Sequence, residues 1–206
     1  MTGILRSLPI GVQSFDNIRN YRFVYVDKTQ YIRDLLQGRV YFLSRPRRFG
    51  KSLLLSTLKA YFEGKKELFK GLFLEHGEPE LAAAQGREAW QKYPVLYLDL
   101  NTEEYKTAED LEKLLKLHLS RWEEVYGKNT NEETYSARFG GIIRRAYEQT
   151  GQQVVFLVDE YDKPLLQSVN NPELYEQFRS LLYAFYSNIK SNDQYIRFVF
   201  LTGVSR

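Results

Sequence analysis

Short apolar runs alternate with stretches of helical hydrophobic spacing along this chain. Four apolar runs predict β-strands at residues 40–43, 95–98, 154–158 and 196–201. Amphipathic helical patterns lie between them, at residues 51–62, 107–126, 135–150 and 172–189. Because strands that alternate with helices need crossover connections, the pattern predicts a three-layer α/β fold with a mostly parallel central sheet.

Three stretches carry weaker signals. A capping-box-like pair, Asp27 and Gln30, predicts a short helix through about Leu36. Alternating aromatic residues at positions 21, 23 and 25 favour a strand with one packed face, with stacking on nucleic-acid bases as the alternative. Between residues 65 and 90 the pattern predicts short helices that are broken at Gly71, Gly77, Pro79 and Gly86.

Composition narrows the classes of protein that this chain can belong to. The 206 residues are 43% hydrophobic and include no cysteine, which excludes disulfides, thiolate metal sites and cysteine nucleophiles. Only two histidines are present, so the chain offers few ligands for a zinc site and few candidates for the histidine of a catalytic triad. The apolar runs are too short to span a membrane, and the N-terminus lacks the apolar stretch of a signal peptide. We therefore expect a cytoplasmic protein of one domain with no membrane partner.

The net charge of +3 conceals an uneven distribution. Residues 19–70 contain thirteen Lys or Arg against four Asp or Glu, a local net charge of +9, so the rest of the chain carries −6. A basic segment indicates an anionic partner, which is a nucleotide phosphate, a nucleic acid or the acidic remainder of the protein. Composition leaves these three alternatives open.

A glycine-lysine-serine sequence separates the first predicted strand from the helix that follows it. Strand, loop and helix are the context that a phosphate-binding P-loop requires. There Gly50 lets the backbone approach a phosphate, Lys51 reaches the β- and γ-phosphates, and the Ser52 hydroxyl ligates magnesium. Arg45 stands where the general P-loop pattern has its first glycine, and the alternative is a basic loop ahead of an amphipathic helix.

Three arginines lie in the same loop, at positions 45, 47 and 48. Guanidinium groups match phosphate oxygens in bidentate geometry, so Arg45, Arg47 and Arg48 are candidate phosphate ligands. A solvated or salt-bridged turn is the equally weighted alternative for each of them.

Carboxylates follow the third predicted strand directly. Several apolar residues followed by Asp159 and Glu160 form the Walker B arrangement of ATPases, in which Asp159 holds magnesium and Glu160 deprotonates the attacking water. The alternative for this pair is an ordinary exposed strand end. Asp162 is a candidate cap for the next turn and a secondary candidate for the site.

Other polar residues stand at strand ends or on helices. In ATPases of this arrangement, the strand between the two Walker strands ends in a polar residue that contacts the γ-phosphate or the water, and Thr202 is the best-placed candidate, with a plain β-prone strand end as the alternative. Ser205 and Arg206 are weaker candidates. Asp99, which also ends a strand, is interpreted as a cap or loop residue, with a place near the site as the alternative. We interpret His118 as structural.

Several motifs together resemble the bacterial predicted AAA-ATPase-like family. They include Leu8–Gly11, the Asp27-Lys28-Thr29 block, Arg45 to Leu54, Val158 to Pro164 and Leu201 to Ser205. The resemblance covers nearly the whole chain and makes Arg45 a family trait. It implies an additional-strand P-loop ATPase fold over residues 1–206, with residues 1–38 leading into a nucleotide-binding core at 39–206.

The resemblance matches Lys51 and Ser52 to the Walker A residues and Asp159 and Glu160 to Walker B. Together with the position of Thr202, this predicts catalytic roles for Lys51, Glu160 and Thr202 and magnesium ligation by Ser52 and Asp159. The role of the Asp27-Lys28-Thr29 block stays unassigned, with the base or sugar of the nucleotide as a guess. The implied nucleotide-binding residues are Arg45, Arg47, Arg48, Phe49, Gly50, Lys51, Ser52 and Leu53.

Longer members of the family continue into a helical lid and often a nuclease-like domain. This chain stops at Arg206, so we expect a domain truncated before the lid and without nuclease activity. The sequence predicts ATP binding with slow or conditional Mg²⁺-dependent hydrolysis. The alternatives are a non-hydrolysing nucleotide switch, acting through a partner protein or a homo-oligomer, and a nucleic-acid-binding surface on the basic segment.

Overall fold

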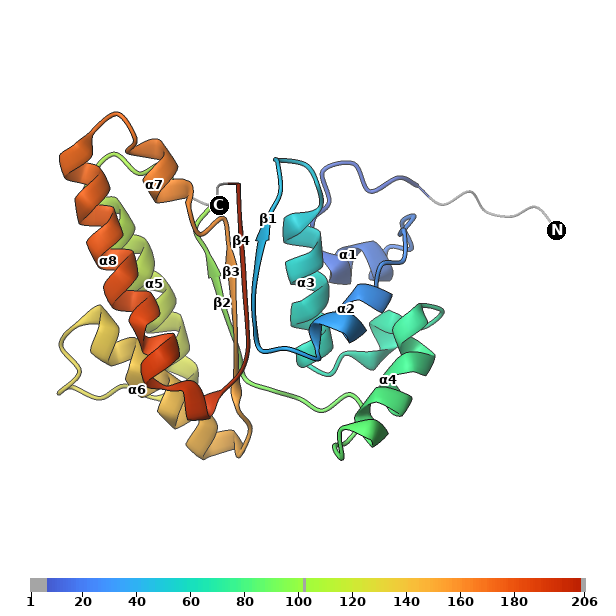
Figure 1. The fold of residues 1–206 in the computed structure, drawn as a ribbon. Coiled ribbons are helices and arrows are strands. Elements are labelled where there is room, and N and C mark those ends of the chain that lie inside the picture. Colours follow the sequence, from blue (N-terminus) through green and yellow to red (C-terminus); the bar gives the residue numbers. More distant parts are fainter. Residues whose placement is uncertain (1–6, 102, 205–206) are drawn as a thin grey trace.

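A four-stranded parallel sheet forms the centre of the protein. The computed structural model describes residues 7–101 and 103–204. The strands are β1 (Val40–Ser44), β2 (Val95–Asp99), β3 (Val154–Asp159) and β4 (Ile196–Gly203), in the spatial order β1-β4-β3-β2. All neighbouring pairs run parallel, which confirms the predicted sheet (Figure 1). β4 thus lies between β1 and β3, as the additional-strand arrangement requires.

Helices cover both faces of this sheet, so the three predicted layers are confirmed (Figure 1). One face carries α1 (Phe15–Asn20), α2 (Gln30–Leu35), α3 (Lys51–Phe62), the short 3-10 helix η1 (Lys66–Phe69) and α4 (Phe73–Ala84). The other carries α5 (Ala108–Tyr126), α6 (Tyr135–Thr150), α7 (Lys163–Gln167) and α8 (Pro172–Ser191), and η2 (Asp193–Tyr195) leads into β4.

The strand β3 divides its side chains between two hydrophobic clusters. Val154, Phe156 and Val158 pack with α5, α6 and α8, whereas Val155 and Leu157 pack with α3. All six residues of β3 are buried, as expected for a strand between two helical layers. Because side chains alternate along a strand, the next residue, the carboxylate at position 159, lies on the α3 face.

Local signals set the ends of the long helices. α5 begins with a capping box between Thr107 and Asp110, and α8 begins with Asn171, whose side chain accepts a hydrogen bond from the Leu174 amide. α6 continues through Gly140. A Cβ at this position would lie 2.8 Å from Asn188 Oδ1, so the close packing of α6 against α8 requires a residue without a side chain. These three helices therefore match their predicted ranges.

Two predictions on the α3 side are wrong, one of them in part. The predicted breaks at Gly71 and Gly86 are confirmed, because both lie outside helices, but α4 is continuous through Gly77 and Pro79, although both residues disfavour a helix interior. Its buried face, which includes Leu74 and Ala82 at or below 1% exposure, gains enough from packing to override local propensity. The buried carboxylate of Glu78, also on α4, adds a hydrogen bond from the Tyr61 hydroxyl, at 2.7 Å.

The aromatic residues 21–25 form turns and irregular backbone, so the predicted strand is absent from this described segment. Instead α1, which the sequence did not predict, precedes them and buries Phe15 and Ile18. Tyr25 packs on the Phe15 ring at 5.3 Å, while Tyr21 is 72% exposed. The alternation of aromatic residues therefore does not mark a strand face, because Tyr25 packs on α1 whereas Tyr21 faces solvent.

Candidate functional site

Polar residues meet along the carboxyl edge of the sheet. In the strand register, Leu43 of β1 pairs with Thr202 of β4, and Asp99 of β2 pairs with Asp159 of β3. The Thr202 hydroxyl donates a hydrogen bond of 2.6 Å to Oδ1 of Asp159, which joins β4 to β3. Thr202 and Asp159 are both buried, so this is a fixed part of the structure rather than a surface contact.

The loop after β1 turns sharply into α3. Gly50 precedes the helix with φ 77°, a left-handed conformation that glycine adopts without steric cost. The Arg45 amide donates to the Gly203 carbonyl at 3.2 Å, which fixes the start of the loop against β4. Arg45, Arg47, Arg48 and Phe49 are exposed, and Phe49 is 67% exposed. The loop therefore presents cationic side chains to solvent above the α3 N-terminus.

Lys51 and Glu160 form a buried ion pair across the site. Lys51 Nζ lies 3.0 Å from Glu160 Oε1, and the two side chains are 3% and 15% exposed. The same ammonium donates to the carbonyls of Arg45 and Pro46, at 3.0 and 3.4 Å. The loop and the acidic strand end, separated by about a hundred residues of sequence, thus meet through a direct contact.

Glu160 holds an unusual backbone conformation. Its φ is +53°, in the left-handed region where a residue other than glycine is strained by about 1–2 kcal/mol. Two hydrogen bonds keep it there: the Glu160 amide donates to the Thr202 hydroxyl at 3.2 Å, and the Tyr161 amide donates to the Thr202 carbonyl at 2.8 Å. In this left-handed conformation the Glu160 carboxylate contacts Lys51, and the two hydrogen bonds to Thr202 hold the backbone in place.

Two further groups surround Asp159 on the α3 face. The Tyr97 hydroxyl lies 3.5 Å from Asp159 Oδ2, and burial raises the pKa of Tyr97, with Asp159 adding to the rise. Burial also raises the pKa of Asp99, and the neighbouring Asp159 carboxylate raises it further. Asp99 accepts a hydrogen bond from the Asn101 amide, so the predicted loop role is confirmed alongside its place near the site. Tyr97 was not among the predicted site residues, although its position two residues before Asp99 puts it on the same strand face.

The family profile described as predicted AAA-ATPase matches residues 9–206. The chain belongs to this family.

One curated relative of this AAA-ATPase-like chain comes from Azotobacter chroococcum mcd 1. It is named an uncharacterized protein in the vnfD 5'region and is 41% identical over 206 residues. The alignment covers 98% of this chain and 38% of the relative, so the chain spans about two fifths of that protein. No solved structure matches the AAA-ATPase-like chain. Within the described residues, no helix has the length and apolar character needed to cross a membrane.

The donor set at the sheet edge fits a nucleotide-bound magnesium ion. Ser52 lies in the first turn of α3, and Asp159 ends β3; hydroxyl and carboxylate oxygens are ligands that Mg²⁺ accepts. The described residues contain no group of three or more Asp, Glu, His or Cys suited to a metal. A dedicated protein cage for a metal is therefore absent from this part of the chain, whereas phosphates and water supply most ligands in nucleotide sites.

Several other candidates have structural roles in this AAA-ATPase-like domain. Asp162 was predicted to cap the next turn, but its side chain makes no capping hydrogen bond; its Oδ2 instead accepts from the Val204 amide at 2.9 Å. His118 is buried beside Trp122, and burial lowers its pKa, in agreement with the predicted structural role. Leu53 packs against the α3-side cluster, and Ser205 and Arg206 lie outside the described residues.

The Asp27-Lys28-Thr29 block connects to α4. Asp27 accepts hydrogen bonds from the Thr29 amide and hydroxyl and, 46 residues away, from the Phe73 amide at 2.7 Å. The Thr29 hydroxyl accepts from the Leu74 amide at 3.2 Å. These contacts satisfy amides in the first turn of α4 and give the block a role in helix packing.

Proposed function

We propose that this chain binds ATP together with Mg²⁺ and hydrolyses it slowly. The observation that carries the proposal is the contact of Lys51 Nζ with Glu160 Oε1 at 3.0 Å, because it joins the loop and the acidic strand end in one site. Family membership supports an ATPase, and the strand order supports the additional-strand arrangement.

The α3 N-terminus is the phosphate-binding element in this proposal. Its free amides and the positive end of the helix dipole favour an anion, and Lys51 adds a full positive charge. The exposed guanidinium groups of Arg45, Arg47 and Arg48 are free to turn toward phosphate oxygens. Ser52 and Asp159 would hold the metal, which supplies charge neutralisation to the phosphates when bound.

Glu160 is the general base of the proposed reaction. A phosphate that binds Lys51 competes with Glu160 for the same ammonium group, so nucleotide binding releases the carboxylate. The released carboxylate accepts a proton from the attacking water. Thr202 positions both acidic residues, since its hydroxyl donates a hydrogen bond to the Asp159 carboxylate and accepts one from the Glu160 backbone amide.

A non-hydrolysing switch is the second candidate, and the same ion pair favours it. Without nucleotide, Glu160 is bound to Lys51 and is not available as a base. If the pair persists once nucleotide binds, Glu160 stays unavailable as a base, and ATP acts by binding without turnover.

Measurements of ATP affinity and ATP turnover separate the two candidates. We expect the wild type to bind ATP with Mg²⁺ and turn it over, Lys51→Ala to lose binding, and Glu160→Gln to bind without turnover. Lys66→Ala, an exposed lysine on η1, is the matched control and should equal the wild type. Binding without turnover in the wild type would establish the switch instead. Absence of ATP binding to a folded wild type would refute both.

A further inference from the structure

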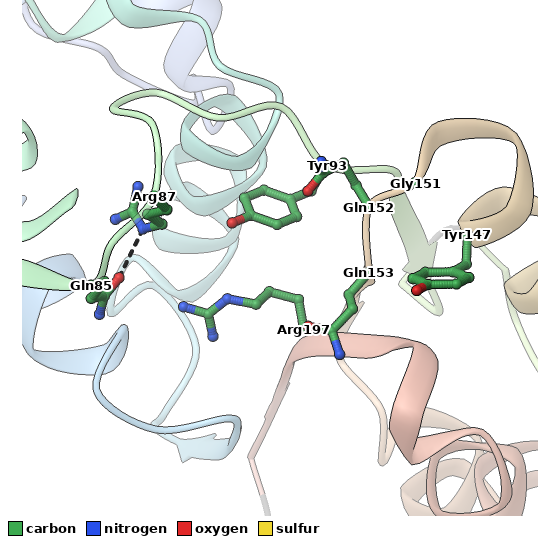
Figure 2. Close-up of a pocket in the computed structure, with 8 residues that line it drawn as sticks. All are labelled: Gln85, Arg87, Tyr93, Tyr147, Gly151, Gln152, Gln153 and Arg197. Atoms are coloured by element: carbon green, nitrogen blue, oxygen red, sulfur yellow. Dashed lines mark hydrogen bonds between the residues drawn. The ribbon is translucent and has the colours of Figure 1, made fainter. Parts of the chain in front are cut away.

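A cavity opens at the end of the sheet opposite the proposed ATP site. It has a volume of about 560 Å³, within the range of small-molecule pockets (Figure 2). It lies where β3 and β4 begin, whereas the proposed ATP site lies where they end. The eight residues of β4 separate the two by about 20 Å. The lining residues are Gln85, Arg87, Tyr93, Tyr147, Gly151, Gln152, Gln153 and Arg197.

A β-bulge positions Arg197 in this cavity. Val154 of β3 pairs with Ile196, but Val155 pairs with Phe198, so Arg197 is the extra residue in β4. Ile196 belongs to the cluster on the α8 side and Phe198 to the cluster on the α3 side, as the extra residue requires. Figure 2 shows the Arg197 side chain extending toward the wall formed by Gln85 and Arg87. The irregularity in the sheet therefore directs one cation into the pocket.

One of the two positive charges that line the cavity is uncompensated. The lining includes two arginines and no carboxylate. Arg87 is already paired with buried Glu78, at 2.6 Å. Within the described part of the chain, the Arg197 guanidinium has neither a hydrogen-bond acceptor nor an ion-pair partner. A guanidinium group with all its donors free, at the wall of a pocket without acids, is suited to an oxyanion.

The remaining walls offer polar and aromatic groups around this cation. Gln152 and Gln153 are fixed by hydrogen bonds, the first accepting from Gln91 at 2.7 Å and the second donating to the Gln194 carbonyl at 2.9 Å. Tyr147 packs on Tyr195, with ring centroids 5.1 Å apart. Amides held in place and aromatic rings provide contacts for the body of a small polar molecule.

We propose that this cavity binds a small molecule that carries a phosphate or carboxylate group, with Arg197 holding the oxyanion through two parallel hydrogen bonds. The amide groups of Gln152 and Gln153 contact the polar body of the molecule. The site is separate from the proposed ATP site and does not depend on it.

Backbone amide NMR spectra test the proposal because they report each site by its own residues. Titration of the full chain with inorganic phosphate, ribose 5-phosphate or succinate should shift the amide signals of residues 151–153. Signals around Gly50 report any phosphate bound at α3. Arg197→Gln should raise the dissociation constant measured from the shifts at 151–153 by at least about tenfold, since a charged hydrogen-bonding partner is lost.

Arg144→Gln is the matched control, because Arg144 is an exposed arginine of α6 outside the cavity and its replacement removes the same charge. It should bind like the wild type, and Arg197→Lys should bind with intermediate affinity. A response to phosphate but not succinate assigns the site to phosphate esters, and the reverse assigns it to carboxylates. Shifts unchanged in a folded Arg197→Gln variant, or absent for all three probes in the wild type, would overturn the proposal.

Discussion

Replacing Glu160 by glutamine removes one charge of the buried pair and keeps its size. The glutamine amide oxygen still accepts from Lys51 Nζ, but the ammonium group loses its charged partner and keeps only neutral acceptors such as the carbonyls of Arg45 and Pro46, in a site where its side chain is 3% exposed. At 3.0 Å and an effective dielectric constant of about 20, the attraction is about 5 kcal/mol, and desolvation of the two charges offsets part of it. We expect Glu160→Gln to lower the free energy of unfolding by about 2–3 kcal/mol without nucleotide.

A double-mutant cycle measures this interaction in urea unfolding at neutral pH. Lys51→Met removes the cation, and the double variant removes both charges, which leaves no unpaired charge in the site. The coupling energy should be about 2 kcal/mol, and Glu160→Gln alone should lower Tm by about 6 °C for a chain of this size. Lys66→Met at an exposed position controls for the loss of a lysine.

The same variant changes nucleotide affinity in the opposite direction. Glu160 competes with a phosphate for Lys51, so Glu160→Gln should bind ATP about tenfold more tightly than the wild type, which corresponds to about 1.4 kcal/mol. Isothermal titration calorimetry checks this. A coupling energy near zero, or ATP affinity that falls in Glu160→Gln, would refute the argument from the ion pair.

Three further changes test other parts of the structure. Glu123→Gln breaks the buried pair with Arg138, 2.7 Å apart, and should cost about 3 kcal/mol at pH 7. The Arg138 hydrogen bond lowers the pKa of Glu123, so this stability is present above the unfolded-state pKa of about 4.3 and is lost as the pH falls through the folded pKa. Urea unfolding should show a smaller difference at pH 3 than at pH 7, and a constant difference would contradict it. Burial raises the pKa of Asp99, so its ionisation destabilises the fold as the pH rises through the folded pKa. Asp99→Asn should raise Tm at pH 7 and leave it unchanged below the unfolded-state pKa of about 3.9, whereas an equal rise at both pH values would argue against burial as the cause. Phe139→Ala removes a buried ring stacked on Phe185 at a centroid distance of 4.2 Å and should cost about 3–5 kcal/mol by calorimetry, and a cost under about 1 kcal/mol would show that the core refills the space.

The types of the main elements could be predicted because periodicity records which side chains are buried. β3 is apolar throughout because helices pack on both of its faces. α3 and α6 end where the sequence predicted, since Gly64 and Gly151 adopt the left-handed conformation that follows many helices, and Thr134 caps the start of α6. Such signals act within a few residues and need no knowledge of the rest of the chain.

The segments on the α3 side were harder to predict because distant contacts decide them. Pro79 stays inside α4 because one face of that helix is buried and its Glu78 carboxylate is paired with Arg87. Phe15 is fully buried in α1, where it meets Tyr25 and Phe69, and a six-residue helix has too short a pattern to recognise. The short elements thus depend on packing for their existence.

For the candidate site, the sequence identified the residues and the structure supplied their relations. Motif spacing singled out Lys51 at the start of a helix and Asp159, Glu160 and Thr202 at strand ends. The tertiary fold alone revealed that Lys51 pairs with Glu160, that Glu160 has a positive φ, and that Thr202 bonds to Asp159. Hydrogen bonds across 40 or more residues leave no local trace in a single sequence.

The sequence by itself determined a parallel α/β sheet and two polar strand ends, because burial and capping leave patterns within one element. The contacts between the site residues, the bulge at Arg197 and the cavity it faces were decided only by the tertiary structure. The reason is that side-chain contacts and cavities depend on how distant segments pack together, and many packings of the same elements satisfy the same local pattern.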